Sequence, residues 1–444
     1  MKITIHNLGF IDKAEIDLRP LTVFIGNNGT GKTWTAYTLS SVFSAYGCRK
    51  YLEAYLDNRT RQKYPVLEDM VQQIINEGSA KIDMVEFADK YLELYINDVA
   101  NMASGWMNSF MASERADFEK LRLDIMLAES KGMLIERIKT ASLEGNIAKE
   151  SVKASKEEGD STLYFYTKDN VSDKLSGNIV RQFSIETVLN ILHYVFYQNI
   201  SLFPTERTTF IIFPFVKREK LKDSDPVTET ILPGAIQHFS RMITWCSNVV
   251  KKDRQNQQYI KLVEVLETEI LQGKVDFETS KLKKELLFHV SKNLKLEMAV
   301  ASSMIKELAP LALYLKNLAE PGDLLIIDEP EMNLHPAAQV ELIEFFAMLV
   351  NAGLNILITT HSPYIVDHLA NLMQAAKHKN KKKIKKLFYL EKTEAFISQD
   401  KVSVYLFEDG IAKNIVDENG VIDWGTFGNV SSDLSRIYSE ILKD

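Results

Sequence analysis

Residues 26–33 read Gly-Asn-Asn-Gly-Thr-Gly-Lys-Thr, and they match the phosphate-binding pattern G-x-x-x-x-G-K-[ST] at every fixed position. An apolar run at 21–25 precedes this stretch and is typical of a buried strand, while residues 34–43 read as a helix. A strand, a glycine-rich turn and a helix N-terminus aim several backbone N–H groups at one point. The stretch therefore predicts a nucleotide phosphate site on an α/β fold.

Two side chains of this loop carry the expected chemistry. Lys32 is placed to reach the β- and γ-phosphates, and the Thr33 hydroxyl is placed to ligate Mg²⁺. The candidate nucleotide-binding residues lie in the loop or in the first helical turn after it. They are Gly26, Asn27, Asn28, Gly29, Thr30, Gly31, Lys32, Thr33 and Thr35.

The composition limits the class of protein. A chain of 444 residues, 45% hydrophobic and 25% charged, can bury a large core and form two or more lobes. No run approaches the ~20 apolar residues of a membrane span, and the N-terminus enters an alternating strand rather than a targeting segment. Cys48 and Cys246 form neither a disulfide framework nor a metal-ligand spacing. We expect a cytoplasmic protein with no membrane partner.

The rest of the pattern indicates an α/β core split by an insertion. Residues 2–25 read as three strands, and helical periodicity then extends from about residue 52 to 152. The clearest helical stretches are 66–75, 84–102 and 118–138. Residues 153–159 are polar and read as a loop, and 161–167 alternate like a strand.

These shifts predict four segments. They are an N-terminal part of the core with the phosphate loop at 1–45, a mainly helical insertion at 46–200, a core strand plus helical segment at 201–290, and a C-terminal part of the core at 291–444. The last segment is expected to end with a strand at 401–407 and a helix at 427–442.

A second acidic motif completes the predicted site. Residues 324–327 are an apolar run that leads directly into Asp328 and Glu329. A central parallel strand reads this way, with its C-terminal end at the ligand crevice. In phosphoryl-transfer sites of this type Asp328 holds Mg²⁺, and Glu329 orients and deprotonates the attacking water.

The next apolar run, residues 354–360, ends at His361. A histidine there can hydrogen-bond the γ-phosphate and sense its presence. Alongside the other motifs, we favour this switch role over a capping or core histidine. The predicted catalytic residues are thus Lys32, Glu329 and His361, and the predicted metal ligands are Thr33 and Asp328.

The sequences Asp-Glu-Pro-Glu-Met-Asn-Leu-His-Pro at 328–336 and Thr-Thr-His-Ser-Pro at 359–363 resemble those of ABC-type ATPases in the RecF, SMC and OLD group. Within this group they are most similar to the OLD-like and PtuA-like AAA-family ATPases of bacterial antiphage systems. The resemblance covers residues 1–45 and roughly 290–440. It implies ATP and Mg²⁺ as cofactors, a homodimer or higher oligomer that closes head-to-tail around nucleotide, and a separate nuclease or toxin effector.

The resemblance also implies a signature motif, and residues 301–308 lie where it is expected. Ser303 and the helix N-terminus there would contact the γ-phosphate held by the partner chain. However, Met304 stands where the family commonly has glycine, and Ser302 or Ser303 could instead simply cap the helix.

Residues 204–207, Pro-Thr-Glu-Arg, resemble the Pro-Ala-Glu-Arg element of OLD-like ATPases. Arg207 would face a phosphate or hold the interface between lobes, and a surface salt bridge is an equal alternative. Gln198 is the nearest candidate for the glutamine of a metal-coupling loop.

A lysine run at 377–386 stands out in a chain whose net charge is −7. It either tracks a nucleic-acid backbone or forms a solvated loop before a strand at 387–390. Contact between this lysine run and DNA would support an alternative function, that of a RecF/SMC-like repair ATPase acting on DNA. A third hypothesis, a scaffold that holds ATP with little turnover, is less compatible with the pair Asp328 and Glu329.

Overall fold

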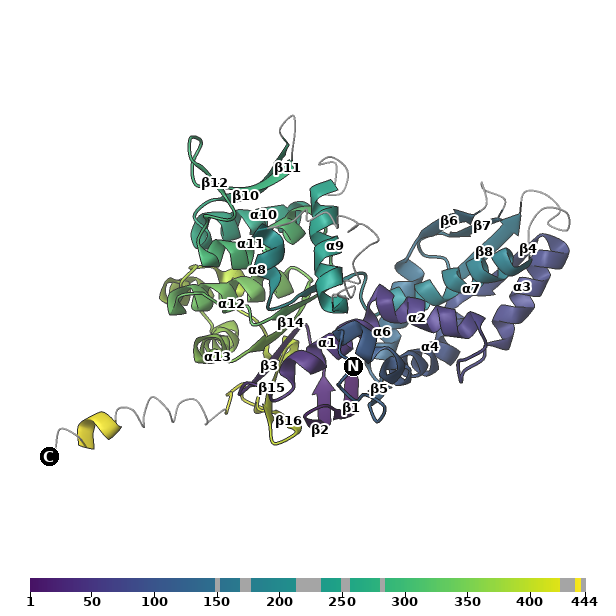
Figure 1. Cartoon of the computed structure of the whole chain (residues 1–444), viewed down its shortest axis with the longest axis horizontal. Helices are drawn as coiled ribbons and strands as arrows, with labels where there is room; N and C mark the ends of the chain where they lie inside the picture. Colours follow the sequence, from purple (N-terminus) through teal and green to yellow (C-terminus); the bar gives the residue numbers. More distant parts are fainter. Residues whose placement is uncertain are drawn as a thin grey trace, which may run out of the picture. The chain divides into compact units, whose positions relative to one another are not determined.

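The computed structural model describes residues 1–147, 152–167, 177–212, 233–248, 256–279, 284–423 and 436–440 (Figure 1). The chain divides into two compact units, which are described separately. The first unit comprises residues 1–8, 38–107 and 117–200, and the second comprises residues 9–37, 108–116 and 201–444.

The second unit is built on a mixed sheet whose strands follow the order β2-β16-β15-β3-β14-β13-β9. The bounds are Ile11–Asp17 (β2), Ile411–Asn414 (β16), Val402–Glu408 (β15), Leu21–Gly26 (β3), Asn355–Thr360 (β14), Leu324–Asp328 (β13) and Ile200–Phe203 (β9). The four strands β15, β3, β14 and β13 run parallel. Both β3 and β13 are buried along their whole length, as expected of strands covered on two faces. The predicted α/β core is confirmed.

Helices of the second unit surround this sheet (Figure 1). They are α1 (Lys32–Phe43, which continues into the first unit), α8 (Arg207–Ile212), α9 (Gly234–Asn248), α10 (Gln257–Val265), α11 (Ser303–Asn317), α12 (Pro336–Asn351), α13 (Pro363–Lys377) and α14 (Lys381–Ile384). A small antiparallel sheet contains β10 (Lys274–Thr279), β11 (Lys284–His289) and β12 (Lys295–Glu297).

Two helices begin where the chain leaves the carboxyl edge of the sheet. α12 has Pro336 in its first turn and His335 as its N-cap, and α13 has Pro363 after the N-cap Ser362. A proline there loses no helical hydrogen bond, because the first N–H groups of a helix have no partner within the helix. Both helix starts therefore lie directly after the motifs of the predicted site.

The first unit combines helices with short strands. β1 (Lys2–Leu8) pairs antiparallel with β5 (Arg122–Met126), and a second sheet has the order β4-β8-β7-β6. Its strands are Ser79–Asp83 (β4), Thr162–Thr167 (β8), Val152–Lys156 (β7) and Leu143–Ile147 (β6). The helices are α2 (Ala45–Leu56), α3 (Pro65–Glu77), α4 (Met84–Asn101), α6 (Ser130–Thr140) and α7 (Gly177–Tyr194). The short α5 (Met107–Met111) belongs to the second unit except for its first residue.

The helical prediction for 118–138 is wrong in its first half. Leu123 and Ile125 alternate with exposed residues in β5, and only α6 is helical. The loop predicted at 153–159 is also wrong in part, because 153–156 belong to β7. In both cases pairing with another strand decided the structure, β1 for β5 and the neighbouring β6 and β8 for β7.

The strand predicted at 387–390 is wrong as well. Lys385–Leu387 forms a 3₁₀ turn, and the backbone N–H groups of Tyr389 and Leu390 donate to the buried Glu344 carboxylate at 2.9 and 2.7 Å. The helix predicted at 427–442 lies mostly outside the described residues. Among those described, no helix is both long and apolar enough to span a membrane.

Candidate functional site

The phosphate loop follows β3 and bends back before α1 begins at Lys32. Gly26 has φ +142°, and a Cβ built on it would lie 2.4 Å from the Phe407 carbonyl oxygen. Gly31 has φ +95°, and its Cβ would lie 2.6 Å from Ile11 Cδ1. Both positions exclude a side chain for steric and conformational reasons. Packing thus holds the loop between neighbouring strands.

Lys32 lies inside this loop with only 5% of its surface exposed. Its Nζ donates hydrogen bonds to the carbonyl oxygens of Gly26 and Asn27 at 2.8 and 2.7 Å. Burial lowers the pKa of Lys32, while nearby carboxylates, Glu329 most strongly, oppose that shift. The loop carbonyls therefore bind the ammonium group, and the negative charges of nearby acidic residues favour its protonated form.

Asp328 is the focus of a cluster of hydroxyl groups. Its Oδ1 accepts hydrogen bonds from Thr33 Oγ1 at 2.9 Å and from Thr359 Oγ1. Its Oδ2 accepts from Thr205 Oγ1 at 2.5 Å and from the Tyr37 hydroxyl at 3.4 Å. A carboxylate and a threonine hydroxyl are the hard oxygen ligands that Mg²⁺ prefers, alongside nucleotide phosphates and water. The donor set at Thr33 and Asp328 fits that ion.

Glu329 and His361 form the second half of the site. The Glu329 Oε1 lies 3.1 Å from His361 Nε2, and both side chains are about one-quarter exposed. This contact lowers the pKa of Glu329 and raises the pKa of His361. Glu329 adopts φ +48°, and its N–H donates to the Thr359 carbonyl oxygen at 3.1 Å. A left-handed backbone at a non-glycine residue is strained, and such strain is typical of functional sites.

Arg207 contacts the backbone of Asp328 and Glu329, and it is 1% exposed. Its NH1 donates to the Asp328 carbonyl oxygen at 2.7 Å and its NH2 to that of Glu329 at 2.9 Å. Its Nε lies 2.8 Å from Glu307 Oε2 on α11, and Glu307 is equally buried. Arg207 therefore contacts backbone carbonyls and a buried carboxylate, and its burial shows that the surface salt-bridge alternative is wrong. The predicted contact of Arg207 with a phosphate stays a prediction.

The signature segment begins α11. Ser302 is the N-cap, and its Oγ accepts the Ile305 N–H at 3.4 Å. Ser303 is the first helical residue, and both serines are exposed. The capping role thus belongs to Ser302, and Ser303 lies at an open helix N-terminus.

A family model described as "AAA ATPase domain" matches residues 1–366 of the chain. The chain belongs to this AAA ATPase domain family. No curated protein sequence matches it. The predicted assignment to an ATPase family is confirmed at this level.

Solved SMC head structures are similar to this AAA ATPase domain protein at low identity. An SMC head bound to the C-winged helix domain of ScpA has 11% identity and a TM-score of 0.36, covering 93% of this chain and 96% of that one. The SMC head domain from Thermotoga maritima has 9% identity and a TM-score of 0.34, covering 93% and 97%. An SMC head with an extended coiled coil bound to the C-terminal domain of ScpA, derived from Pyrococcus furiosus, has 12% identity and a TM-score of 0.38, covering 98% of each chain.

Thr35, a predicted nucleotide-binding residue, has a local structural role. The Thr35 hydroxyl donates to the Gly31 carbonyl oxygen at 2.9 Å within the first turn of α1, and Thr35 is fully buried. Gln198 is exposed in the segment between α7 and β9. Thr35 therefore does not face the loop surface, and the metal-coupling role of Gln198 stays a prediction.

Several residues of the site were not predicted from the sequence. Thr359 and Thr205 hold Asp328, and Glu331 accepts hydrogen bonds from Thr360 and the His361 N–H. The signals were present, because threonines end an apolar strand and a third acid follows the acidic pair. Only the folded chain shows which of these polar groups meet.

A shallow cavity of about 230 Å³ adjoins the loop, and it is lined by residues 28–34, Phe10 and Glu329. Phe10 is 66% exposed, and its ring centroid lies 6.1 Å from that of Trp34. Phe10 lies in the turn between β1 and β2, and Trp34 lies in the first turn of α1. The rings of Phe10 and Trp34, here called the aromatic shelf, lie beside the phosphate loop.

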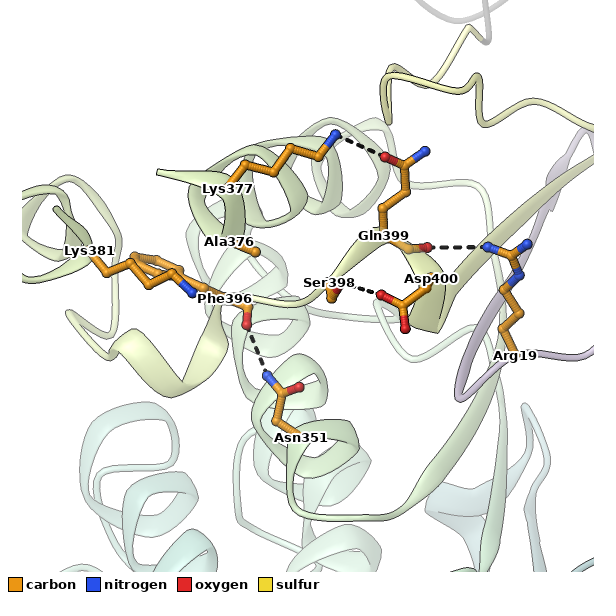
Figure 2. A pocket seen from close by; sticks show the side chains of 9 residues that line it. All are labelled: Arg19, Asn351, Ala376, Lys377, Lys381, Phe396, Ser398, Gln399 and Asp400. Atoms are coloured by element: carbon orange, nitrogen blue, oxygen red, sulfur yellow. Dashed lines mark hydrogen bonds between the residues drawn. The ribbon is translucent and has the colours of Figure 1, made fainter. Parts of the chain in front are cut away.

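A larger cavity of about 590 Å³ lies at the other edge of the sheet, where β3 and β15 begin (Figure 2). Its polar side chains bond mainly to one another and to backbone. Lys377 Nζ donates to Gln399 Oε1 at 2.9 Å, Asn351 Nδ2 to the Phe396 carbonyl oxygen at 3.0 Å, and Arg19 NH1 to the Gln399 carbonyl oxygen at 3.3 Å. These bonds fix the segment before β15 and give this cavity a structural explanation. Cavity volume alone therefore does not identify the nucleotide site.

Proposed function

We propose that the protein is a Mg²⁺-dependent ATP hydrolase in which two copies close around nucleotide. The observation that carries this proposal is that Glu329, which contacts His361, directly follows Asp328, whose carboxylate accepts the Thr33 hydroxyl. An acceptor for a water proton and oxygen ligands for a cation are thus neighbours at the carboxyl edge of one sheet.

Each residue of the site has a separate role in the proposed hydrolysis. Glu329 accepts a proton from water as the water oxygen attacks the γ-phosphorus, and the bond to the leaving ADP oxygen breaks. The hydrogen bond from His361 lowers the pKa of Glu329 and so favours its carboxylate form. The backbone N–H groups of the loop and Lys32 face the phosphate charge. Bound Mg²⁺, held by Thr33 and Asp328, would neutralise charge on the phosphate oxygens.

The aromatic shelf supports a nucleotide rather than a bare phosphate. Phe10 and Trp34 present ring surface next to the loop, where a purine base can stack. Phe10→Ala is expected to raise the Kd for ATP while leaving the Kd for inorganic triphosphate unchanged.

A second copy of the chain would complete the site. The N-terminus of α11 is open, with Ser303 exposed and Val300 71% exposed. Exposed helix N-terminal N–H groups and a serine hydroxyl suit a phosphate brought by a partner. Sedimentation of Glu329→Gln with and without Mg-ATP tests this step, and an unchanged monomer in both conditions contradicts it.

The biological setting that we propose is antiphage defence, in which the ATPase senses infection or scaffolds a separately encoded nuclease. Its support is the resemblance of residues 328–336 and 359–363 to OLD-like and PtuA-like ATPases. The test is co-purification with products of neighbouring genes, comparing the native chain with Glu329→Gln in ATP. Retention of a nuclease that depends on the ATP-trapped state supports the proposal. Its consistent absence contradicts it.

A repair ATPase that acts on DNA is the second candidate. The observation that favours it is the lysine run, in which Lys379, Lys381–Lys383 and Lys386 are exposed. Clustered exposed lysines attract a phosphodiester backbone in a salt-dependent manner. DNA retention by Glu329→Gln that falls steeply between low and physiological salt would favour this function over a protein scaffold.

A further inference from the structure

Glu331 is a buried carboxylate that the proposed hydrolysis does not use. It is only 9% exposed, and it does not line the cavity beside the phosphate loop. Burial raises its pKa, and its Oε2 has no hydrogen-bond partner among the described residues. A buried acid with an unsatisfied oxygen is unfavourable unless the surrounding structure requires it.

Both hydrogen bonds to Glu331 come from the segment that carries the switch histidine. Its Oε1 accepts the Thr360 hydroxyl at 2.6 Å and the His361 backbone N–H at 2.8 Å. His361 in turn places Nε2 3.1 Å from Glu329. The Glu331 carboxylate therefore binds the side chain of Thr360 and the backbone amide of His361.

These bonds belong to a closed ring. Thr360 Oγ1 accepts the Ser362 N–H at 2.9 Å, and Ser362 Oγ donates to Gln339 Oε1 at 2.5 Å. Gln339 Nε2 then donates to the Leu334 carbonyl oxygen at 2.9 Å, and the Leu334 N–H returns to the Glu331 carbonyl oxygen at 3.0 Å. The ring joins the starts of α12 and α13 on either side of the acidic turn.

We propose that Glu331 is the positioning residue of His361. It holds the 360–361 backbone so that the imidazole meets Glu329, and the ring ties that position to the 333–336 segment before α12. This inference rests on the proposed ATPase function, because the histidine matters through the base that it contacts. Side chains that hold functional groups in place commonly change activity by about 10- to 100-fold when removed.

The test compares Glu331→Ala with Glu331→Gln, which keeps an oxygen acceptor and the shape of the side chain. Glu331→Ala is expected to lower kcat about 10- to 100-fold with the Kd for ATP unchanged, and Glu331→Gln to restore most of the activity. Equal losses in both variants would show that charge matters rather than position, and would overturn the proposal. Thr360→Val, which removes one donor to the same oxygen, replaces Glu331→Ala if that variant does not fold.

Glu344 offers a matched control. It is a fully buried glutamate that, like Glu331, accepts two hydrogen bonds, here from two backbone N–H groups, and it contacts a histidine, His368, at 2.8 Å. Glu344→Ala should lower thermal stability with little change in kcat per folded molecule. If it lowers kcat as much as Glu331→Ala does, general loosening of the fold explains both results.

The decisive measurement repeats Glu331→Ala in a His361→Ala background. If Glu331 acts through the imidazole, the second substitution changes kcat by less than about twofold there. A full 10-fold or larger loss in that background overturns the positioning role. The background must retain measurable turnover, so its rate is compared with that of Glu329→Gln.

A separate measurement keeps this inference distinct from the ATPase proposal. In ¹⁵N-histidine spectra without nucleotide, the His361 signals are assigned by their loss in His361→Ala. Glu331→Ala is expected to move them, and Glu344→Ala is not. Absence of hydrolysis by the native chain would refute the proposed function, whereas unmoved His361 signals would refute the role of Glu331.

Discussion

The buried pair formed by Arg207 and Glu307 offers the sharpest test of how the site is held. Each is 1% exposed, and Arg207 also donates to the carbonyl oxygens of Asp328 and Glu329. Arg207→Met removes the charge and these donors at nearly constant volume. It leaves Glu307 buried without a countercharge, which costs about 3–5 kcal/mol of the free energy of unfolding.

For a unit of this size, that loss corresponds to a fall in melting temperature of about 5–8 °C. The matched variant Arg207→Met/Glu307→Leu replaces the pair with apolar groups. It should recover most of the stability, because desolvation of the pair offsets much of its attraction. Catalysis should not recover, since the carbonyls of the acidic turn still lack their donors.

The assay is thermal unfolding of the three proteins by circular dichroism, followed by ATP turnover measured well below each transition. A loss below about 1 kcal/mol in Arg207→Met would refute the reasoning about the buried charge. Full turnover in the double variant would show that Arg207 does not position the turn that carries Glu329. The two results are independent of each other.

Three further predictions concern the chemistry of the site. Glu329→Gln should lower ATP turnover about 10²- to 10⁴-fold while ATP binding persists, as measured by steady-state kinetics and calorimetry; equal turnover would exclude Glu329 as the base. Chelation with EDTA should weaken nucleotide binding by the native chain. Thr33→Ala should weaken binding in the presence of Mg²⁺ but should leave metal-free binding unchanged, and an equal loss in both conditions would contradict a metal role. The contact between Glu329 and His361 should stabilise the nucleotide-free protein most between about pH 4.3 and 6.5, where both unfolded-state groups are charged. Because the pKa of Glu329 is lowered and that of His361 is raised, this contribution is lost as pH falls through the first folded pKa and as it rises through the second. The melting-temperature difference between the native chain and His361→Ala should therefore shrink above pH 7, and a constant difference would contradict the contact.

Local sequence determined the parts of the site that lie on contiguous residues. The loop at 26–33 has glycines at the two positions, Gly26 and Gly31, where the structure has no room for a side chain. The apolar runs before Glu329 and His361 became the parallel strands β13 and β14. Such features are readable because the backbone conformation and burial of a short segment depend on its own residue types.

Tertiary structure decided which distant groups meet. Arg207, Glu307 and the carbonyls of the acidic turn come from three separate segments, and neither spacing nor composition indicates that the guanidinium contacts the other two. The same is true of Thr205 on Asp328 and of Glu331 on the His361 backbone. Register also overrode local pattern in β5 and β7, where pairing with another strand fixed an extended backbone. The physical reason is that hydrogen bonds and ion pairs between side chains depend on three-dimensional distance, whereas periodicity reports only which face of one element is buried.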